Sequence, residues 1–453
     1  MSEWDLVVCG AGPAGCALAA KVASGGRRVL LLERSSAPGQ GRDWVVDVAS
    51  DTFAAARVPE PAAAELFVEP DATYLVTTDR NSMVRLLDSP VLPVRNAPYV
   101  RRLADWAVEC GATLETETTV LGPLIEDEAV TGARLSAPGG EREVTSSITA
   151  DCTGIGSSIR RRTPEAWHMS DGLAPSQIVL ARRETRLVDR DAAAANVRDG
   201  HMMDRARLDR IGTQGPYSIE TCFLDLARGF ADILIGVKPG SGPDADERFT
   251  AFLAERPYVG DKVFGDGGPI PIRRPLDTFV ADGLVVLGDS ACQTIPAHGS
   301  GTASALLAAD MCAQAVLRAL ETGRSDRAAL WGYNHGFMLA RGAVLAYYDV
   351  MRRHTDRQDV ADLNTMLRTG VLGPGEVLAG LFPEVPRLGP RQVAGKLRGM
   401  ANVWPVMPGV IRAGLLAGRA MEHYVEYPPV YRPGSLEDWI KAAPRGAREP
   451  SVD

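Results

Sequence analysis

Residues 10–15 of the chain read GAGPAG, a spacing of glycines that joins a strand to a helix in many nucleotide-binding domains. The six residues before it, WDLVVC at 4–9, are predicted to form a buried strand. The alanine-rich stretch after it is predicted to form a helix that ends at the glycines 25–26. A second buried strand, RVLLLE at 28–33, follows. This order predicts a βαβ unit that binds a dinucleotide.

Each residue of the motif has its own predicted role. Gly10 makes the tight turn, Gly12 lets the backbone approach a pyrophosphate, and Gly15 lets the helix lie close to the sheet. Pro13 and Ala14 open the helix, whose N–H groups and dipole attract the phosphates. We therefore assign all five residues to the cofactor site.

The second predicted strand ends on Glu33, where a carboxylate accepts hydrogen bonds from ribose hydroxyl groups. An acid at this position disfavours a 2′-phosphate, so the nucleotide is predicted to be FAD or NAD rather than NADP. The neighbouring Arg34 is assigned to the same site.

A second glycine-bearing segment, residues 282–320, distinguishes FAD from NAD. A predicted strand at 284–287 is followed by a polar loop and then by an Ala/Leu-rich helix. FAD needs such a second anchor, because its ribityl chain and flavin ring extend away from the first motif. Asp289 is predicted to bind a ribityl hydroxyl, and the amides at 299–301 are predicted to face the flavin N1–C2=O edge. The assigned residues here are Gly288, Asp289, Pro296, Gly299, Ser300 and Gly301.

Two further segments lie between these motifs. Arg95 heads a predicted helix with apolar residues at helical spacing. Residues 144–161 are predicted to be a strand that ends at Asp151 and is followed by Gly154. Arg95, Asp151 and Gly154 complete the predicted cofactor-binding set.

These four segments, in this order, resemble the geranylgeranyl reductase family of flavoproteins, within the wider class that includes para-hydroxybenzoate hydroxylase. The closest likeness is in GDSACQTIPAHGSG at 288–301 and the upstream GGPIPIRRP at 267–275. The resemblance implies that the glycines, Glu33, Arg95 and Asp289 contact FAD. Two family features are absent: the loop at 34–50 has no cysteine, and the strand region 223–240 has no tryptophan. The WxWxIP motif of halogenases is also absent, so halogenation is not expected.

The predicted fold is α/β: an FAD-binding Rossmann-like domain of the glutathione reductase type, interrupted by an antiparallel-sheet substrate domain and followed by a helical C-terminal region. LARG at 226–229 is predicted to be the turn of a hairpin in that sheet. The FAD-binding domain is predicted at 1–43, 95–165 and 277–325, and the substrate side at 44–94 and 166–276. The helical region is predicted at 326–443, with a disordered tail at 444–453.

Composition excludes several classes of protein. A net charge of −8 argues against a nucleic-acid partner, and neither the seven cysteines nor the six histidines show metal-ligand spacing. No signal sequence or uninterrupted transmembrane run is present in the sequence, so a cytoplasmic location is expected. The apolar C-terminal helices could contact a membrane, but core packing is the simpler interpretation. The sequence does not predict the oligomeric state.

No second GxGxxG motif follows a strand, so the flavin is expected to be reduced by transient NAD(P)H docking or by a protein electron donor. Three functions stay open: hydride transfer to a carbon–carbon double bond of an apolar small molecule, monooxygenation with O₂, or non-catalytic FAD binding. His298 is the candidate proton donor, although a loop histidine bonded to the backbone is the alternative. Asp232 and Tyr217 are further candidates for reaching the substrate.

Overall fold

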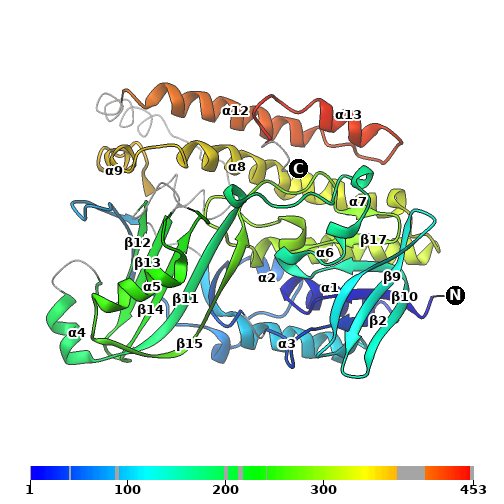
Figure 1. The fold of residues 1–453 in the computed structure, drawn as a ribbon, viewed down its shortest axis with the longest axis horizontal. Coiled ribbons are helices and arrows are strands. Elements are labelled where there is room, and N and C mark those ends of the chain that lie inside the picture. Colours follow the sequence, from blue (N-terminus) through cyan, green and yellow to red (C-terminus); the bar gives the residue numbers. More distant parts are fainter. Residues whose placement is uncertain are drawn as a thin grey trace.

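Two large β-sheets lie side by side, and helices from the last third of the chain form a layer along one side of both (Figure 1). The computed structural model describes residues 2–39, 42–86, 91–197, 202–212, 218–240, 242–374 and 404–448. Tyr217, one of the predicted substrate-side candidates, lies outside the described residues.

The first sheet has a parallel core in which apolar strands are buried on both faces, as expected for a doubly covered sheet. Its strand order is β16-β17-β10-β1-β2-β7. The bounds are β1 Trp4–Cys9, β2 Val29–Leu32, β7 Thr113–Glu115, β10 Gly140–Asp151, β16 Val280–Ala281 and β17 Leu284–Val286. Segments from both ends of the predicted FAD-binding domain therefore share one sheet.

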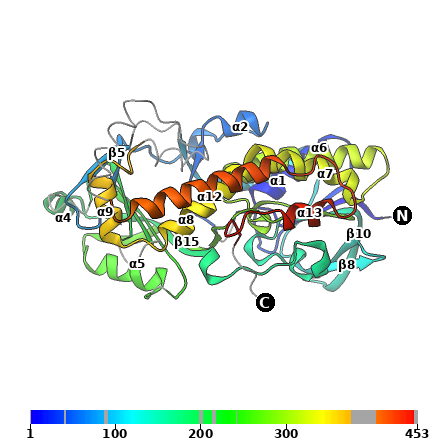
Figure 2. The same cartoon turned by 90° about the horizontal axis from the view of Figure 1, so that it is seen from above.

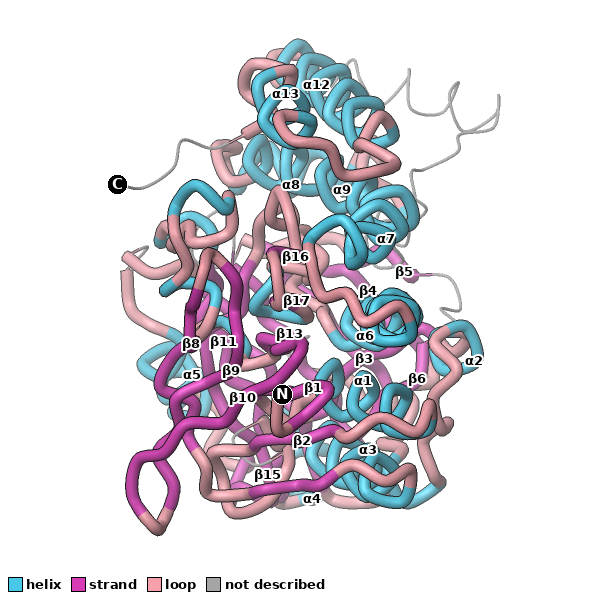
Figure 3. Tube along the Cα trace, turned by 90° about the vertical axis from the view of Figure 1, so that its right-hand side faces the viewer, coloured by secondary structure: helices cyan, strands magenta, loops and turns pink. Residues whose placement is uncertain are grey.

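Strand β10 is long enough to belong to two arrangements. Its first half pairs antiparallel with β9, and its second half pairs parallel with β1. Strands β8 (Thr119–Glu126) and β9 (Ala129–Ala137) form a hairpin beside it. Figure 3 shows this hairpin on one side of the parallel strands and helices α1, α3 and α6 on the other.

Three helices cover the other face: α1 (Pro13–Ser24), α3 (Asn96–Glu109) and α6 (Thr302–Glu321). Many of the α1 and α6 residues that pack together are alanines, which let the two helices approach closely. Among the described helices, α6 alone has the length and composition to cross a membrane. Most of its residues are buried, as in a core helix.

The second sheet is mainly antiparallel, in the order β15-β11-β14-β13-β12-β4-β5. The predicted LARG hairpin is confirmed, because Asp225 of β13 pairs with Phe230 of β14 across it. A two-stranded ribbon, β3 with β6, is the third sheet. The bounds are β3 Val45–Ala49, β4 Ala72–Val76, β5 Met83–Leu86, β6 Val91–Arg95, β11 Ile178–Val188, β12 Ala206–Ile211, β13 Ser218–Asp225, β14 Phe230–Val237 and β15 Val259–Pro271.

Helix α5 (Ala245–Ala254) covers one face of this second sheet, where β-strand residues such as Cys222, Ile233 and Ile235 pack with Phe249. Two short helices lie elsewhere: α2 (Thr52–Ala55) packs against α6, and α4 (Arg190–Asn196) follows β11. The opposite face is therefore the one left for the ribbon and the first sheet's domain.

The helical layer begins with α7 (Arg327–Phe337), which continues through a π-helical turn at Met338–Gly342 into α8 (Ala343–Thr355). Helix α12 (Met407–Val425) packs along α8, as the view from above shows (Figure 2). Helices α9 (Val360–Arg368) and α13 (Ser435–Lys441) complete the layer.

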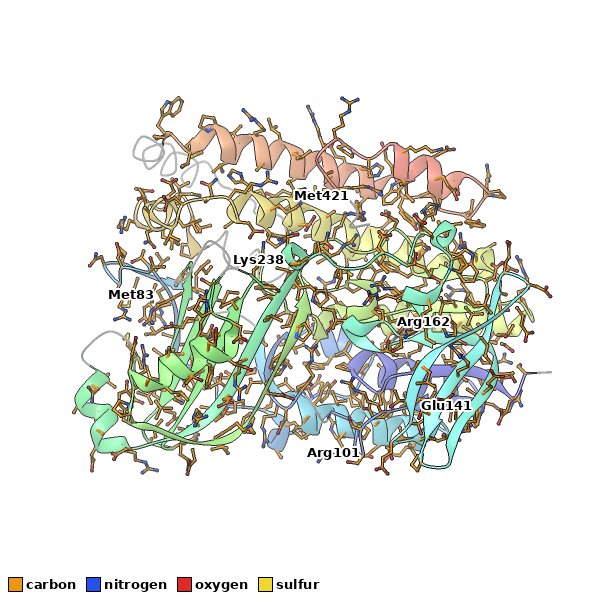
Figure 4. All side chains as sticks on the ribbon, in the orientation of Figure 1. Met83, Arg101, Glu141, Arg162, Lys238 and Met421 are labelled. Atoms are coloured by element: carbon orange, nitrogen blue, oxygen red, sulfur yellow. The ribbon has the colours of Figure 1, made fainter. Side chains whose placement is uncertain are left out.

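An ion pair ties the second sheet to this layer. Lys238, just after β14, lies between the sheet and α8 in Figure 4 and pairs with Asp356 at the end of α8. The layer is thus fixed to the substrate side as well as to the parallel sheet.

The described structure has the predicted architecture of an α/β nucleotide-binding domain, an antiparallel sheet and C-terminal helices. The predicted disorder of the tail is wrong for residues 444–448. Ala447 is buried, and Arg448 Nη1 lies 2.9 Å from Asp277 Oδ2. Residues 449–453 lie outside the described residues, and the predicted domain boundaries stay a prediction.

Candidate functional site: two glycine turns at one sheet edge

The first turn is built so that two of its glycines cannot carry a side chain. A Cβ on Gly10, whose φ is +108°, would lie 2.4 Å from the Cys152 carbonyl oxygen. A Cβ on Gly15 would lie 2.0 Å from the Gly10 carbonyl oxygen. A Cβ on Gly12 would meet nothing within 4 Å. Gly10 and Gly15 are therefore required by the fold, whereas Gly12 faces open space where a ligand can approach.

The start of helix α1 is available to an anion. Gly12 is the N-cap residue, Pro13 occupies the first turn, and no side chain caps the helix start. Glu33 lies over the same turn, with Oε2 accepting a hydrogen bond from Ala11 N at 3.1 Å. Its Oε1 accepts one from Ser35 N at 2.9 Å, while the adjacent Arg34 is exposed.

The second turn meets the first at the carboxyl ends of β1 and β17, two parallel strands that flank β10. Cys9 of β1 is aligned with Asp151 of β10, and Asp151 is aligned with Val286 of β17. Beyond β17, Gly288 has φ +66°, and a Cβ there would lie 3.5 Å from the Cβ of Ala14. Two segments more than 270 residues apart, by the numbering of Ala14 and Gly288, thus form one surface. This is the edge at which ligands bind in open α/β sheets.

Asp151 has a different role from the predicted one. It is fully buried, and its carboxylate accepts hydrogen bonds from Thr153 N (3.0 Å), Thr153 Oγ1 (2.6 Å), Arg160 N (2.8 Å) and Ser290 Oγ (3.2 Å). These bonds leave the carboxylate no open side for a cofactor, so the prediction that it binds one is corrected. Asp151 is a positioning residue. It joins the turn after β17, which holds Ser290, to a third turn, which follows β10 and holds Thr153.

Gly154 lies on the open side of that third turn. Its φ is +76°, and a Cβ there would meet nothing within 4 Å. Its carbonyl accepts a hydrogen bond from Ser290 Oγ at 2.9 Å, which links it to the Gly288 turn. Gly154 therefore stays in the proposed cofactor-binding set.

Charged groups flank the second turn. Burial raises the pKa of Asp289, and Arg42, with Nη2 at 3.6 Å from Asp289 Oδ2, acts in the opposite direction. Arg42 was not found by sequence reasoning, because nothing in its local pattern marks it. Arg95, at the N-cap of α3, lies over the Phe264 ring at 4.4 Å, and its buried Nε has no hydrogen-bond partner among the residues that the structure describes. A buried donor without a partner fits a ligand-binding role.

The loop before α6 presents backbone groups at the same edge. Gly299 has φ +81° and donates from its N–H to the Ile295 carbonyl at 2.8 Å, while Pro296 beside it is buried. Gly301 is the N-cap of α6, with no side chain capping the helix. The loop residue Ser300 donates from its N–H to His298 Nδ1 at 3.3 Å. His298 is thus backbone-bonded, as its alternative interpretation expected, with Nδ1 as acceptor, which leaves the proton on Nε2 in the neutral ring.

The second sheet contributes a charged network that sequence reasoning mostly missed. Arg183 donates to Asp232 Oδ2 from Nε (2.9 Å) and Nη2 (2.7 Å). Asp232 is buried and also accepts a hydrogen bond from Thr185, so it does not reach an open surface as suggested. Arg207 donates to Asp47 Oδ2 at 2.6 Å. Burial raises the pKa of Asp47, but Arg207 and Arg183 outweigh it and hold the pKa at about 2.

No group of three His, Cys, Asp or Glu side chains that could hold a metal ion occurs among the residues that the structure describes. The geometry therefore supports a site for an organic cofactor at the sheet edge that carries the two glycine turns.

Comparison with known proteins agrees with this geometry. The family described as FAD dependent oxidoreductase matches residues 5–161, which include the first turn, Arg95 and Asp151. Digeranylgeranylglycerophospholipid reductase of Sulfolobus acidocaldarius is 26% identical over 83% of the chain and 82% of that protein. The chain thus resembles FAD-dependent oxidoreductases, and most extensively the geranylgeranyl reductases among them. The digeranylgeranylglycerophospholipid reductase of Methanoculleus marisnigri is 24% identical over 81% of this chain and 89% of that protein.

Solved structures show the same fold. A geranylgeranyl bacteriochlorophyll reductase-like protein from Thermoplasma acidophilum has a TM-score of 0.73 at 17% identity, covering 90% of this chain and 99% of that chain. Aklavinone-11 hydroxylase with FAD and aklavinone has a TM-score of 0.57 at 15% identity, covering 79% and 71% of the two chains. The predicted fold class and the predicted resemblance are therefore confirmed, and the match to the FAD dependent oxidoreductase family supports the predicted FAD.

Proposed function

We propose that this oxidoreductase transfers a hydride from reduced FAD to a carbon–carbon double bond of an apolar, isoprenoid-like small molecule. The observation that carries the proposal is the similarity to digeranylgeranylglycerophospholipid reductases over four fifths of the chain. The two glycine turns support it, because they give FAD one continuous binding edge.

The proposed FAD contacts divide along that edge. The adenosine and pyrophosphate half would be held by the first turn and the end of β2, that is by Gly10, Gly12, Pro13, Ala14, Gly15, Glu33 and Arg34, with Arg95 and Gly154 beside it. The flavin half would be held by the second turn and the loop before α6, that is by Gly288, Asp289, Pro296, Gly299, Ser300 and Gly301. When bound, FAD supplies the hydride; the chain supplies orientation and exclusion of water.

Hydride addition to one carbon of a double bond must be matched by a proton on the other carbon. His298 is the proposed donor, because it lies in the loop that leads to α6 and its imidazolium form can give up a proton. The neutral ring that remains after transfer can accept the Ser300 N–H at Nδ1, which is the bond that the structure has. Of the described residues in this loop, His298 is the one with a side chain able to donate a proton at neutral pH.

Electrons would come from NAD(P)H docking transiently or from a protein electron donor. A cytoplasmic location, unlike the FAD-dependent chemistry, stays a prediction. The second candidate function is monooxygenation, which the structural similarity to aklavinone-11 hydroxylase favours at the level of the fold.

The test is single-turnover oxidation of the reduced holoprotein. The protein is reduced with NADPH, NADH or dithionite and mixed with geranylgeraniol while the flavin spectrum is followed, in one series without oxygen and in a second series with oxygen present. Anaerobic, substrate-dependent reoxidation together with loss of one double bond by mass measurement supports the reductase. Substrate-dependent oxygen uptake with an oxygenated product overturns it in favour of the monooxygenase. A flavin that none of the three donors reduces overturns both, in favour of a non-catalytic role.

The His298→Asn variant tests the proton donor separately. Removal of a general acid lowers the rate by about 10²–10⁴-fold, so reoxidation by substrate should slow by at least about 100-fold while reduction by the donor is unchanged. His168→Asn is the matched control, because His168 is a part-exposed histidine with φ +59°, a conformation that asparagine tolerates. Equal rates in the two variants would exclude His298 as the donor.

A further inference from the structure

The face of the second sheet that carries the ribbon is not purely apolar. One group of interacting polar side chains, here called the polar floor, crosses four elements: β3, β11, β12 and β14, with β13 contributing one hydroxyl. Its members are Asp47, Arg183, Arg207, Asp209, Thr221 and Asp232.

Strand register puts these residues on one face. Asp209 is directly opposite Thr221, and the Thr221 hydroxyl donates to Asp209 Oδ1 at 2.7 Å. Arg183 Nη1 donates to the Val45 carbonyl of the ribbon at 2.9 Å. The alternate residue Arg182 lies on the other face, over the Phe249 ring of α5 at 5.6 Å. Period-2 alternation thus separates the polar floor from the face covered by α5.

The polar floor has a buried part, in which the charges pair with each other, and a partly exposed part, called the open part below. The Arg183 and Asp232 side chains are 9% and 2% exposed, and they satisfy each other. The Asp47, Arg207 and Asp209 side chains are 22%, 20% and 18% exposed, so they reach open space. This difference identifies the surface at which a ligand can meet the floor.

Arg207 is the donor in that open part. Its Nη1 donates to Asp47 and its Nε donates to Asp209 Oδ1 at 2.9 Å. Its Nη2 donates to no group in the described parts of the chain, and it is not among their buried atoms without a partner. The two carboxylates therefore fix the plane of the guanidinium and leave one edge directed at open space.

This open part lies beside the proposed flavin loop. When protonated, His298 would act through space to lower the pKa of Asp47, so the two side chains are near each other. A Cβ on Gly299, the next residue, would lie 3.3 Å from Ile270 and 3.8 Å from Val179 on the same face of the sheet. The polar floor is thus placed where a substrate must pass to reach the flavin.

One end of this face is apolar. Four phenylalanine rings contact one another at the end of the sheet near Arg95, with centroid separations of 5.1–6.1 Å. They are Phe67, Phe223, Phe230 and Phe264. An uninterrupted hydrocarbon laid across the face would remove water from the open charges of the floor without replacing their hydrogen bonds, which is unfavourable.

We propose that the substrate carries one neutral oxygen, a hydroxyl or a carbonyl, that accepts a hydrogen bond from Arg207 Nη2 beside His298. The oxygen is neutral because the floor has three carboxylates and two guanidinium groups, an excess of one negative charge that disfavours a phosphate or carboxylate there. This inference rests on the proposed function, which supplies the apolar chain of the substrate. It adds the polar group of the substrate that the polar floor binds.

The test measures ligand affinity by perturbation of the flavin spectrum in the oxidised holoprotein. The probes are a C20 isoprenoid alcohol, the hydrocarbon of the same chain, and the alcohol's monophosphate, with naphthol and naphthalene as a second pair that has no isoprenoid chain. Loss of one buried hydrogen bond reduces affinity by about tenfold, so each alcohol should bind about tenfold more tightly than its hydrocarbon. The monophosphate should bind more weakly than the C20 alcohol.

The Arg207→Lys variant keeps the positive charge but lacks the planar guanidinium group with its several fixed N–H donors. The ratio of alcohol affinity to hydrocarbon affinity should therefore fall below about twofold, while the affinity for the hydrocarbon is unchanged. Arg182→Lys, on the α5 face of the same sheet, should keep the full preference. FAD content and circular dichroism check that both variants are folded. Equal affinity for alcohol and hydrocarbon in both pairs, or tightest binding of the phosphate, overturns the inference. A preference seen with naphthol alone supports the inference and overturns the isoprenoid part of the proposed function.

Discussion

The cofactor edge of the first sheet and the polar floor of the second sheet are built by opposite means. The edge is made of backbone, and Gly10 and Gly15 are needed in it because a Cβ on either would collide with a main-chain atom. The floor is made of long charged side chains that bind one another across several strands. The first arrangement suits an invariant ligand such as a pyrophosphate, whereas the second can change with the substrate.

The largest expected effect is at the backbone turn. Gly15→Ala should abolish accumulation of folded protein, because its Cβ would lie 2.0 Å from a main-chain oxygen in the buried core. Gly418→Ala in α12 is the control, since a Cβ there meets nothing within 4 Å and alanine favours a helix. Soluble yield and circular dichroism measure both. A well-folded Gly15→Ala variant that binds FAD would refute the claim that backbone contact dictates this turn.

A smaller loss is expected in the floor. Asp232→Ala removes both hydrogen bonds that Asp232 accepts from the buried Arg183 guanidinium, which keeps only the Val45 carbonyl and Asp47 at 3.7 Å, and should reduce the free energy of unfolding by about 3 kcal/mol. Asp71→Ala removes an exposed ion pair with Arg205, but Arg205 still pairs with Asp225. The free energy of unfolding should therefore fall by only about 0–1 kcal/mol. Urea denaturation compares the two variants. Similar losses would mean that burial does not distinguish the floor from surface pairs.

The smallest effect lies in the helical layer, outside both regions. His423 stacks on Trp439 at 4.5 Å, and burial, with a contribution from Arg448, lowers its pKa from 6.5 to about 4. The folded state then binds fewer protons than the unfolded state, so stability is lost as the pH falls from about 6.5 to about 4.

The variant His423→Phe keeps the stack and removes this titration. Its melting temperature should fall less than that of the wild type across the same pH interval, by a few degrees, since about 1 kcal/mol corresponds to roughly 2–4 °C in a domain of this type. Parallel pH curves for the two proteins would show that His423 does not carry the acid sensitivity of the layer.

Sequence reasoning located the first glycine turn because the order of strand, glycines and helix is a local pattern. Gly15 faces the main chain of Gly10, five residues away, whereas the contact of Gly10 with Cys152 depends on the fold. Asp151 shows the limit: its position at a strand end was predicted, but its burial depends on Ser290 and Arg160, which arrive from other turns. Position along the chain does not specify which way a carboxylate points.

The floor could not be predicted, because its partners are brought together only by the fold. Asp47 and Arg207 are 160 residues apart, and Arg183 and Asp232 are 49 apart. Asp232 was named as a candidate because it lies on the substrate-side sheet, yet its face and its partner Arg183 needed the strand register. Long-range ion pairs leave no local pattern of the kind that glycine turns leave.

The measurement that tests the central claim most directly is the ratio of FAD to chain in the purified protein and in Gly12→Val. A Cβ on Gly12 meets no atom of the described residues within 4 Å, so the variant should fold, with unchanged circular dichroism. It should nevertheless lose FAD, because the added side chain fills the space left for the pyrophosphate. We predict about one FAD per chain in the wild type and almost none in the variant. A colourless wild type that does not take up FAD, or a variant that retains it fully, would contradict the account.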